Sequence, residues 1–302
     1  KIWNAARFIE MNLGETMPAE PAASALLPQD RWVLHQLNRL TKEVTENLEK
    51  FELGIALQKV YDFIWEEFCD WYIEMVKPRL WNKEDPTREA ALWTLREVLS
   101  RALKLLHPFM PFITEEVFLS LNEEDSIMVS SWPVEEARFV FPEDAAEVER
   151  VKDAVREIRR IRTSMNVAPG QQAEVFVVSE DEAVLDSFRR AEDFFRVLGR
   201  ASEVKLQKDK TGIREDTVSA VIPGAMIYIP FADLVDVEKE KERLAKEEAR
   251  LESEIARADG MLRNEKFLAK APADKVAAEQ EKRKKYEEML EKVREQRKML
   301  GA

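Results

Sequence analysis

The side chains best suited to catalysis are few in this chain and lie far apart. His35 and His107 are the two histidines, Cys69 is the single cysteine, and Glu66–Glu67 and Glu115–Glu116 are adjacent acidic pairs. No phosphate-binding glycine loop, HExxH pair or nucleophile elbow accompanies them. Neighbouring residues on a helix point about 100° apart, so each acidic pair is typical of a solvated face or a cap. We therefore expect no catalytic residue and no metal site, with structural roles for the histidines and Cys69.

A polar helix face near residue 1 has the chemistry of base recognition. One face of this helix is apolar and carries Ile2, Ala5, Ala6, Ile9 and Leu13. Asn4, Arg7 and Phe8 project to the opposite side, together with Met11. An aromatic ring between an amide and a guanidinium can stack on an unpaired base and hydrogen-bond its edge. The alternative is that Phe8 packs on a neighbouring helix, as aromatic side chains commonly do.

Ile73 is a second apolar residue that lies out of phase with its helix. On an α-helical wheel it is about 160° from the core face, beside Asp70, Glu74 and Lys77. We expect it to be exposed. A single exposed isoleucine is common on protein surfaces, so its position alone does not assign it a function.

Two groups of basic residues interrupt the acidic trend of the sequence. The first comprises Arg150, Lys152, Arg156, Arg159, Arg160 and Arg162. The second comprises Arg257, Arg263, Lys266 and Lys270. Either group could contact nucleic-acid phosphates. The alternatives are an ordinary solvated helix face for the first and the solubility of a coiled coil for the second.

The composition limits the class of protein that positions these residues. The chain has 302 residues, a net charge of −12 and 45% hydrophobic residues, which predicts a folded protein of two or three domains. Only 8 residues are glycine, which favours long helices. One cysteine excludes a disulfide framework and, without a signal peptide, fits a cytoplasmic location. The longest uncharged stretch, Thr217 to Ala232, is too short and proline-rich to span a membrane.

Hydrophobic periodicity divides the chain into three parts, 1–140, 141–235 and 236–302. The first part is a predicted helical bundle, whose helices are marked by apolar runs within 2–13, 34–48, 57–75 and 91–106. The second is a small α+β module. Its predicted elements are a charged helix over 144–163, a strand over 174–178, a helix over 181–198, a strand over 203–206, and a hairpin of strands 217–222 and 226–229. The third is a predicted antiparallel coiled-coil hairpin, because apolar residues repeat at 3–4 spacing on both sides of Pro272. The fold class is therefore mainly α.

Several segments resemble the C-terminal part of valyl-tRNA synthetases. Lys1 to Phe8 (KIWNAARF) is similar to the first helix of their anticodon-binding domain, and Trp65 to Glu74 (WEEFCDWYIE) to a later one. Leu106 to Glu116 (LHPFMPFITEE) is shared with isoleucyl relatives, so it indicates only the wider class I group. The last segment resembles the coiled-coil arm, with NEKF at Asn264 to Phe267 and KAPA at Lys270 to Ala273. The resemblance covers essentially the whole chain.

The resemblance implies a partner and a set of contacts. Phe8 and Ile73 would lie against the anticodon bases of tRNA(Val), with Asn4 and Arg7 beside them. The arm would rest on the outer corner of the tRNA, where the D and T loops meet. The expected backbone contacts are Arg156, Arg159, Arg160, Arg257, Arg263 and Lys266.

The chain departs from the full family in what it lacks. Neither the HIGH-type nor the KMSKS-type signature of the catalytic domain occurs in it. We therefore expect a fragment of a monomeric, ATP-dependent valine–tRNA ligase that would be inactive and without a cofactor when alone. Its partners would be tRNA(Val) and the upstream catalytic and editing domains of the same polypeptide. The alternative is a helical scaffold that binds other proteins and no RNA.

Overall fold

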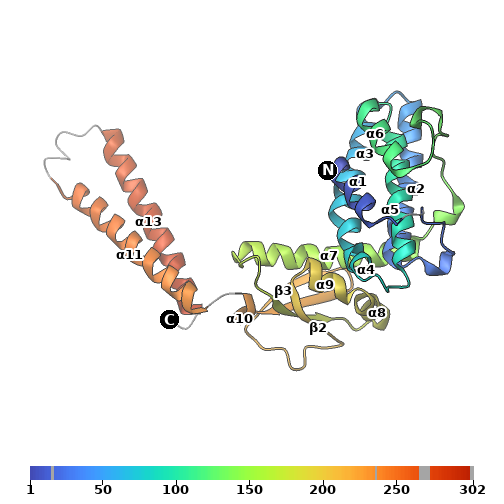
Figure 1. The fold of residues 1–302 in the computed structure, drawn as a ribbon. Coiled ribbons are helices and arrows are strands. Elements are labelled where there is room, and N and C mark those ends of the chain that lie inside the picture. Colours follow the sequence, from blue (N-terminus) through green and yellow to red (C-terminus); the bar gives the residue numbers. More distant parts are fainter. Residues whose placement is uncertain (15–16, 235–236, 265–272, 300–302) are drawn as a thin grey trace.

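The computed structural model describes residues 1–14, 17–234, 237–264 and 273–299 and is mainly helical (Figure 1). A helical bundle stands on one long helix, a small sheet lies on the other side of that helix, and a pair of long helices projects away from both. This confirms the predicted class, mainly α with a small sheet. No helix in the described ranges is long and apolar enough to cross a membrane.

The bundle contains each of the four predicted helical runs. Its helices are α1 (Ile2–Asn12), α2 (Pro28–Glu49), α3 (Leu53–Asp62), a π-helix η2 (Phe63–Tyr72), α4 (Ile73–Trp81), α5 (Arg88–Leu106) and α6 (Pro111–Leu121), with short 3₁₀ turns η1 (Ala23–Ala25), η3 (Ile127–Val129) and η4 (Ala137–Phe139). Apolar spacing correctly placed the buried residues of α2, where Leu34, Leu37 and Val44 are at most 1% exposed. The sequence did not predict the change from α to π geometry in the third run.

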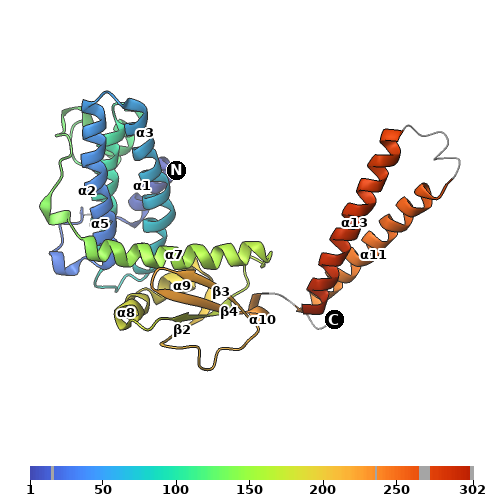
Figure 2. The ribbon, with the colours of Figure 1, turned by 180° about the vertical axis from the view of Figure 1, so that it is seen from behind.

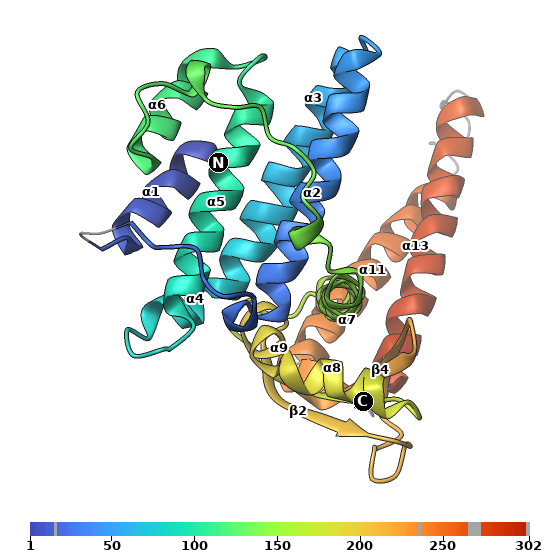
Figure 3. The same ribbon diagram turned by 90° about the vertical axis from the view of Figure 1, so that its right-hand side faces the viewer.

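Helix α7 (Pro142–Ser164) joins the bundle to the sheet. One side of it packs on α2 and the other on strand β3, and Figure 3 shows it end-on between the two. Its buried residues, which include Val148, Val155 and Ile158, belong to one continuous hydrophobic core that runs from α1 to Leu234. The bundle and the sheet therefore share a single core.

The sheet has four strands in the order β2-β1-β4-β3. Its elements are β1 (Ala173–Val178), α8 (Glu182–Arg190), α9 (Glu192–Leu198), β2 (Ala201–Gln207), β3 (Thr217–Ile222), β4 (Ala225–Pro230) and the short α10 (Phe231–Leu234). β1 and β2 are parallel, because α8 and α9 cross over between them, whereas β4 is antiparallel to β1 and β3. The predicted hairpin is confirmed: Ile222 pairs with Ala225 across a turn in which Gly224 has φ +80°, a value that favours glycine. The helix predicted over 181–198 is divided at Ala191.

Two long helices, α11 (Val237–Leu262) and α13 (Ala273–Met299), lie side by side. Leu244, Leu251, Leu290 and Val293 form a core between them that is separate from the main one. The guanidinium of Arg294 pairs with Glu248 at 2.7 Å and Glu252 at 2.6 Å, and Arg283 pairs with Asp259 at 2.6 Å. The arginine nearer the start of α13 pairs near the end of α11, and the later arginine pairs earlier in α11. The two helices are therefore antiparallel.

A buried polar cluster fastens the bundle where α2, η2 and α4 meet. The Asp30 side chain is 0% exposed and accepts hydrogen bonds from the Tyr72 hydroxyl at 2.8 Å and from Arg79 Nη1 at 2.7 Å. Its second oxygen accepts from the backbone N–H of Leu27 and so caps α2. Arg79 also donates to the side chain and the carbonyl of Thr87, just before α5.

The cluster also shifts the pKa of its members. Burial and the Asp30 carboxylate raise the pKa of Tyr72 well above its usual range. Burial alone would lower the pKa of Arg79, but the charge and hydrogen bond of Asp30 outweigh it and raise the pKa. Arg79 therefore stays ionised inside the core.

Replacing Asp30 with alanine should lower the free energy of unfolding by about 3–5 kcal/mol, because it leaves the Arg79 charge buried without a partner. Chemical denaturation of the full chain measures this change. The control is Asp144→Ala, which removes a partly exposed ion pair with Arg31 and should cost below about 1 kcal/mol. The double variant Asp30→Leu/Arg79→Met should recover part of the loss, and equal effects of Asp30→Ala and Asp144→Ala would contradict the assignment.

Candidate nucleic-acid interface

The structure places the predicted base-recognition residues at the surface of α1. Ala5, Ala6 and Ile9 are at most 4% exposed, whereas Asn4 and Arg7 are exposed. Phe8 is half-buried: its ring packs on the core, and Lys77 Nζ lies 6.0 Å from the ring centroid. The ring therefore packs against the core and still reaches the surface, and its contact with a base stays a prediction.

Contacts along its length set α1 beside η2 and α4. Lys1 Nζ lies 2.5 Å from an Asp70 carboxylate oxygen and 4.0 Å from the centroid of the Trp65 ring. Residue numbers rise together in the Lys1–Asp70 and Phe8–Lys77 contacts. α1 therefore runs in the same direction as the continuous helical segment formed by η2 and α4. Arg88 of α5 donates to the carbonyl of Asn12 at 2.8 Å and holds the far end of α1.

The expectation that Ile73 is exposed is wrong, because its side chain is only 7% exposed. The ten residues before it form a π-helix, in which hydrogen bonds run from i to i+5 and each residue advances less around the axis than in an α-helix. A wheel drawn at 100° per residue therefore loses phase before it reaches Ile73. Its contact with a base stays a prediction that depends on the family resemblance alone, and the half-buried Glu74 and Lys77 stand at the surface of the same turn.

Arg150 of α7 donates to the Ser187 hydroxyl at 3.3 Å, and the other basic residues of this helix divide into three environments. Lys152 is 0% exposed and pairs with Glu67 at 2.5 Å and Glu149 at 2.7 Å, so it belongs to the core. Arg156 and Arg160 are on the outside, where carboxylates at i−3 lie 2.8 and 2.7 Å away.

Arg159 and Arg162 lie in the third environment, near the C-terminal end of α7. Arg159 Nε donates to the carbonyl of Leu198 at 2.9 Å, and its guanidinium lies 5.3 Å from the Trp71 ring centroid. Burial lowers the pKa of both arginines, and for Arg162 the neighbouring Arg200 adds to the effect. In the described part of the chain neither one pairs with a carboxylate within 4.0 Å. Of the predicted phosphate contacts on α7, Arg159 thus has the freest charge.

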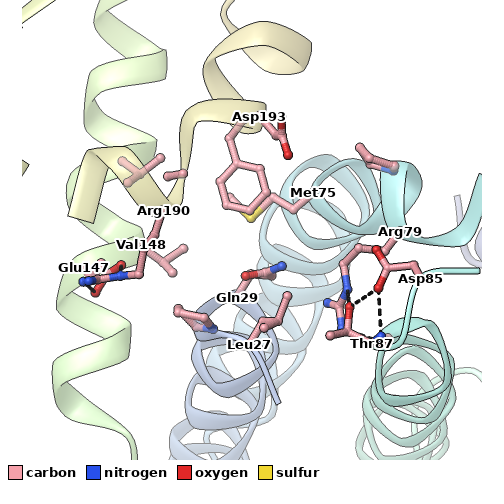
Figure 4. Close-up of a pocket in the computed structure, with 15 residues that line it drawn as sticks. Leu27, Gln29, Met75, Arg79, Asp85, Thr87, Glu147, Val148, Arg190 and Asp193 are labelled. Atoms are coloured by element: carbon pink, nitrogen blue, oxygen red, sulfur yellow. Dashed lines mark hydrogen bonds and ion pairs between the residues drawn. The ribbon is translucent and has the colours of Figure 1, made fainter. Parts of the chain in front are cut away.

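A hollow between the bundle and the α8–α9 segment is not suited to a ligand. It measures ≈ 320 Å³ and is drawn in Figure 4, where Gln29, Met75 and Val148 line it. Both of its arginines already have partners: Arg79 turns toward Asp85 and Thr87, and Arg190 pairs with Glu147 at 2.6 Å. We interpret it as a packing gap at the joint.

The two histidines have structural partners. His35 Nδ1 accepts from the backbone N–H of Phe141 at 3.1 Å, and burial, reinforced by Arg39, lowers the pKa of His35. His107 Nδ1 lies 2.7 Å from the Thr114 hydroxyl. Within the residues the structure describes, no cluster of histidine, cysteine or acidic residues could hold a metal ion.

Comparison with known proteins agrees with this geometry. Residues 30–177 match the family model described as the anticodon-binding domain of tRNA ligase, and residues 236–301 match the valyl tRNA synthetase tRNA binding arm. The chain is 44% identical over 297 residues to a valine–tRNA ligase of Clostridium acetobutylicum, 45% over 302 residues to one of Clostridium tetani, and 35% over 297 residues to one of Bacillus cereus. These alignments cover 98–99% of this chain and 34% of each relative.

The chain belongs to the valyl-tRNA synthetase family. It spans about a third of the length of the curated relatives it matches and corresponds to their C-terminal part. The α11–α13 pair is the segment that matches the family's arm.

Two of the predicted contacts lie near the C-terminal end of α11, the end that Figure 2 shows away from the sheet. Arg257 is largely exposed and pairs with Glu254 at 3.0 Å. Arg263 is exposed just beyond the end of α11. Lys266, also predicted, lies outside the described residues.

Sequence reasoning missed two features of this surface. Arg200, 38 residues beyond Arg162, comes next to it only because α9 packs on α7, and no local pattern marks it. An apolar hollow of ≈ 290 Å³ where α1, α3, η2 and the junction of α5 and α6 meet is lined by Trp3, Tyr61 and Trp65. The phase of Trp3, outside the apolar face of α1, was a signal that could have found it.

Cys69 should react slowly with thiol reagents near neutral pH. Burial raises its pKa to about 11, so at pH 8 only about one thiol in a thousand is ionised. Because the chain has one cysteine, colour release from a disulfide reagent reports on it alone. We expect a rate far below that of the same chain in denaturant, and equal rates would contradict the buried environment.

Proposed function

We propose that this chain is the tRNA-binding part of a valine–tRNA ligase and that it recognises the anticodon of tRNA(Val). The observation that carries the proposal is the surface of α1, where Asn4 and Arg7 are exposed and Phe8 is half-buried, on a bundle that matches the anticodon-binding domain of tRNA ligase from residue 30 onward. The Phe8 ring would stack on an unpaired base, while the amide and the guanidinium hydrogen-bond its edge. Lys77 lies next to the ring and pairs with Glu74 at 2.5 Å.

The arm supplies the second contact in this proposal. We take α11 and α13 as an antiparallel coiled coil, separated from the rest at about residue 236, that braces the outer corner of the tRNA. Arg257 and Arg263 stand where such a contact would occur. Backbone and shape contacts there would add affinity without discriminating among tRNAs, because bases in that corner are engaged in loop–loop pairing.

Ligation itself would belong to the rest of the parent protein. The nucleotide-binding signatures are missing from this chain, so ATP would be used by the catalytic domain, and the chain would carry no cofactor. The parent would act as a monomer in the cytoplasm, with the catalytic and editing domains on the same polypeptide. The scaffold alternative gains no support, since the buried apolar residues of α11 and α13 face each other.

Replacing Phe8 with alanine should weaken binding of a valine tRNA by about 1–3 kcal/mol, the usual contribution of one stacked base. The free energy of unfolding should fall by less than the about 3–5 kcal/mol that truncation of a core phenylalanine to alanine costs, because the ring is only half-buried. Titration of labelled tRNA and thermal melting measure the two effects.

The matched control for this variant is Phe51→Ala, at an 87%-exposed position in the turn between α2 and α3. It should leave tRNA affinity unchanged. A collapse of melting temperature in Phe8→Ala would make Phe8 a core residue and contradict the stacking role.

Deleting residues 237–300 should weaken the binding of a valine tRNA and of a non-cognate tRNA by similar factors. The dependence of affinity on salt should also become shallower, because fewer counterions are released. The remainder should stay folded, because the arm has its own core. Binding against salt concentration for the intact and shortened chains is the measurement, and an unchanged slope and affinity would show that the arm does not contact tRNA.

A further inference from the structure

A hollow of ≈ 760 Å³ lies at the C-terminal end of α7, where that helix meets α4 and the end of α9. Its polar lining comprises Glu74, Arg159, Arg162, Thr163, Asn166 and Arg200. Three guanidinium groups and one carboxylate leave it strongly positive, in a chain whose net charge is −12. Thr163, Asn166 and Arg200 are exposed, so the hollow is open to solvent.

Arg162, which lines this hollow, has an unused hydrogen-bond donor. Its side chain is 91% buried, and Nη2 donates to the carbonyls of Gln171 at 2.6 Å and Ala168 at 3.2 Å. Nη1 is buried and has no hydrogen-bond partner. A buried donor on a charged group is costly when unpaired, so the site is incomplete as it stands. The negative end of α7 accounts for a cation here but gives Nη1 no partner.

Arg200 provides a second cation that lines the same hollow. It has φ 57°, a left-handed conformation that residues other than glycine and asparagine adopt rarely, and its carbonyl accepts from the backbone N–H of Ala173 at 3.2 Å. Glycine would adopt this backbone conformation with less strain than arginine does. The chain nevertheless has an arginine, and therefore a cation, at this position. Since Arg200 and Arg162 are close enough to repel each other, an anion between them would remove that repulsion.

The hollow adjoins the surface proposed for base recognition. Glu74 at its edge is one turn of α4 before Lys77, which contacts Phe8, and Arg159 stacks on Trp71 just before α4. Paired guanidinium groups bind the oxygens of a phosphate with several directed hydrogen bonds, which a single lysine cannot do. An RNA strand whose base stacks on Phe8 could therefore extend along α4 into this hollow.

We propose that this hollow is a phosphate-binding site, in which Arg162 and Arg200, with Arg159 at the edge, hold one backbone phosphate of the RNA whose bases contact α1. The proposal rests on the proposed function. It adds a fixed anchor at the joint of the bundle and the sheet, away from the arm.

The test uses the full chain and an RNA hairpin with the anticodon stem and loop of a valine tRNA. Arg200→Gly removes the cation and relieves the backbone, so the melting temperature without ligand should be unchanged or higher. Its affinity for the hairpin should fall about tenfold. The slope of log affinity against log salt should become shallower by about 0.7–0.9, the value for one phosphate contact. Arg200→Lys should restore most of the slope.

The matched control is Arg196→Ala, one turn earlier on α9, where the guanidinium is exposed and paired with Glu192 at 2.6 Å. It should bind the hairpin like the unmodified chain. An Arg200→Gly variant with unchanged affinity and slope would overturn the proposal. Inorganic phosphate alone is tested by its effect on the melting temperature. If phosphate stabilises the chain only when Arg200 is present, while Arg200→Gly leaves RNA affinity unchanged, the site binds free phosphate. That result would also overturn the proposal.

The same titrations separate this inference from the proposed function. If Arg200→Gly weakens binding of the RNA hairpin and Phe8→Ala does not, the phosphate site is supported and base stacking on α1 is contradicted. If Phe8→Ala weakens binding of the RNA hairpin and Arg200→Gly does not, the anticodon contact is supported and the phosphate site is contradicted.

Discussion

The ion pair between Asp30 and Arg79 is the constraint on which the recognition surface depends. One carboxylate caps α2, accepts from the Tyr72 hydroxyl and neutralises the guanidinium of α4, which in turn holds Thr87 before α5. Each of these groups would be costly to bury alone, and together they satisfy one another. The cluster therefore fixes the position and rotation of α4, and with it the surface turn that carries Glu74 and Lys77.

Helix α7 extends this constraint from the bundle to the sheet. Its buried Lys152 pairs with Glu67 of η2 and Glu149, and the ammonium lies 4.4 Å from the centroid of the Trp32 ring. Because the same helix packs on β3, the two halves share one core and cannot move independently without exposing it. Arg159 and Arg162 thus have a defined position relative to α1, whereas the arm, with a core of its own, has none of these ties.

Electrostatics here are local rather than global. A net charge of −12 opposes non-specific attraction to a polyanion. Most arginines on the outside of α7 are neutralised by carboxylates three residues away, which removes them as general phosphate contacts. Among the described residues, Arg159 and Arg162 of α7 have no carboxylate within 4.0 Å, and they line one hollow together with Arg200. Such a distribution would favour RNA that fits the shape of the protein over RNA in general.

The sequence by itself determined the helices of the bundle, the Pro223–Gly224 hairpin and the polar face of α1. These depend on residues close in the chain: 3.6-residue periodicity buries Leu34 and Leu37, and a glycine permits the positive φ of a tight turn. It also carried the family motifs that point to anticodon recognition.

Only the tertiary structure decided which of those residues are available. Ile73 is buried because a π-helix shifts the phase that an α-helical wheel assumes, and Lys152 is in the core because two carboxylates from η2 and α7 enclose it. Arg200 meets Arg162 because α9 packs against α7, a contact between residues 38 positions apart. Local periodicity reports the forces between neighbours in the chain, whereas the depth of a charge and the identity of its partner depend on which surfaces the whole core brings together.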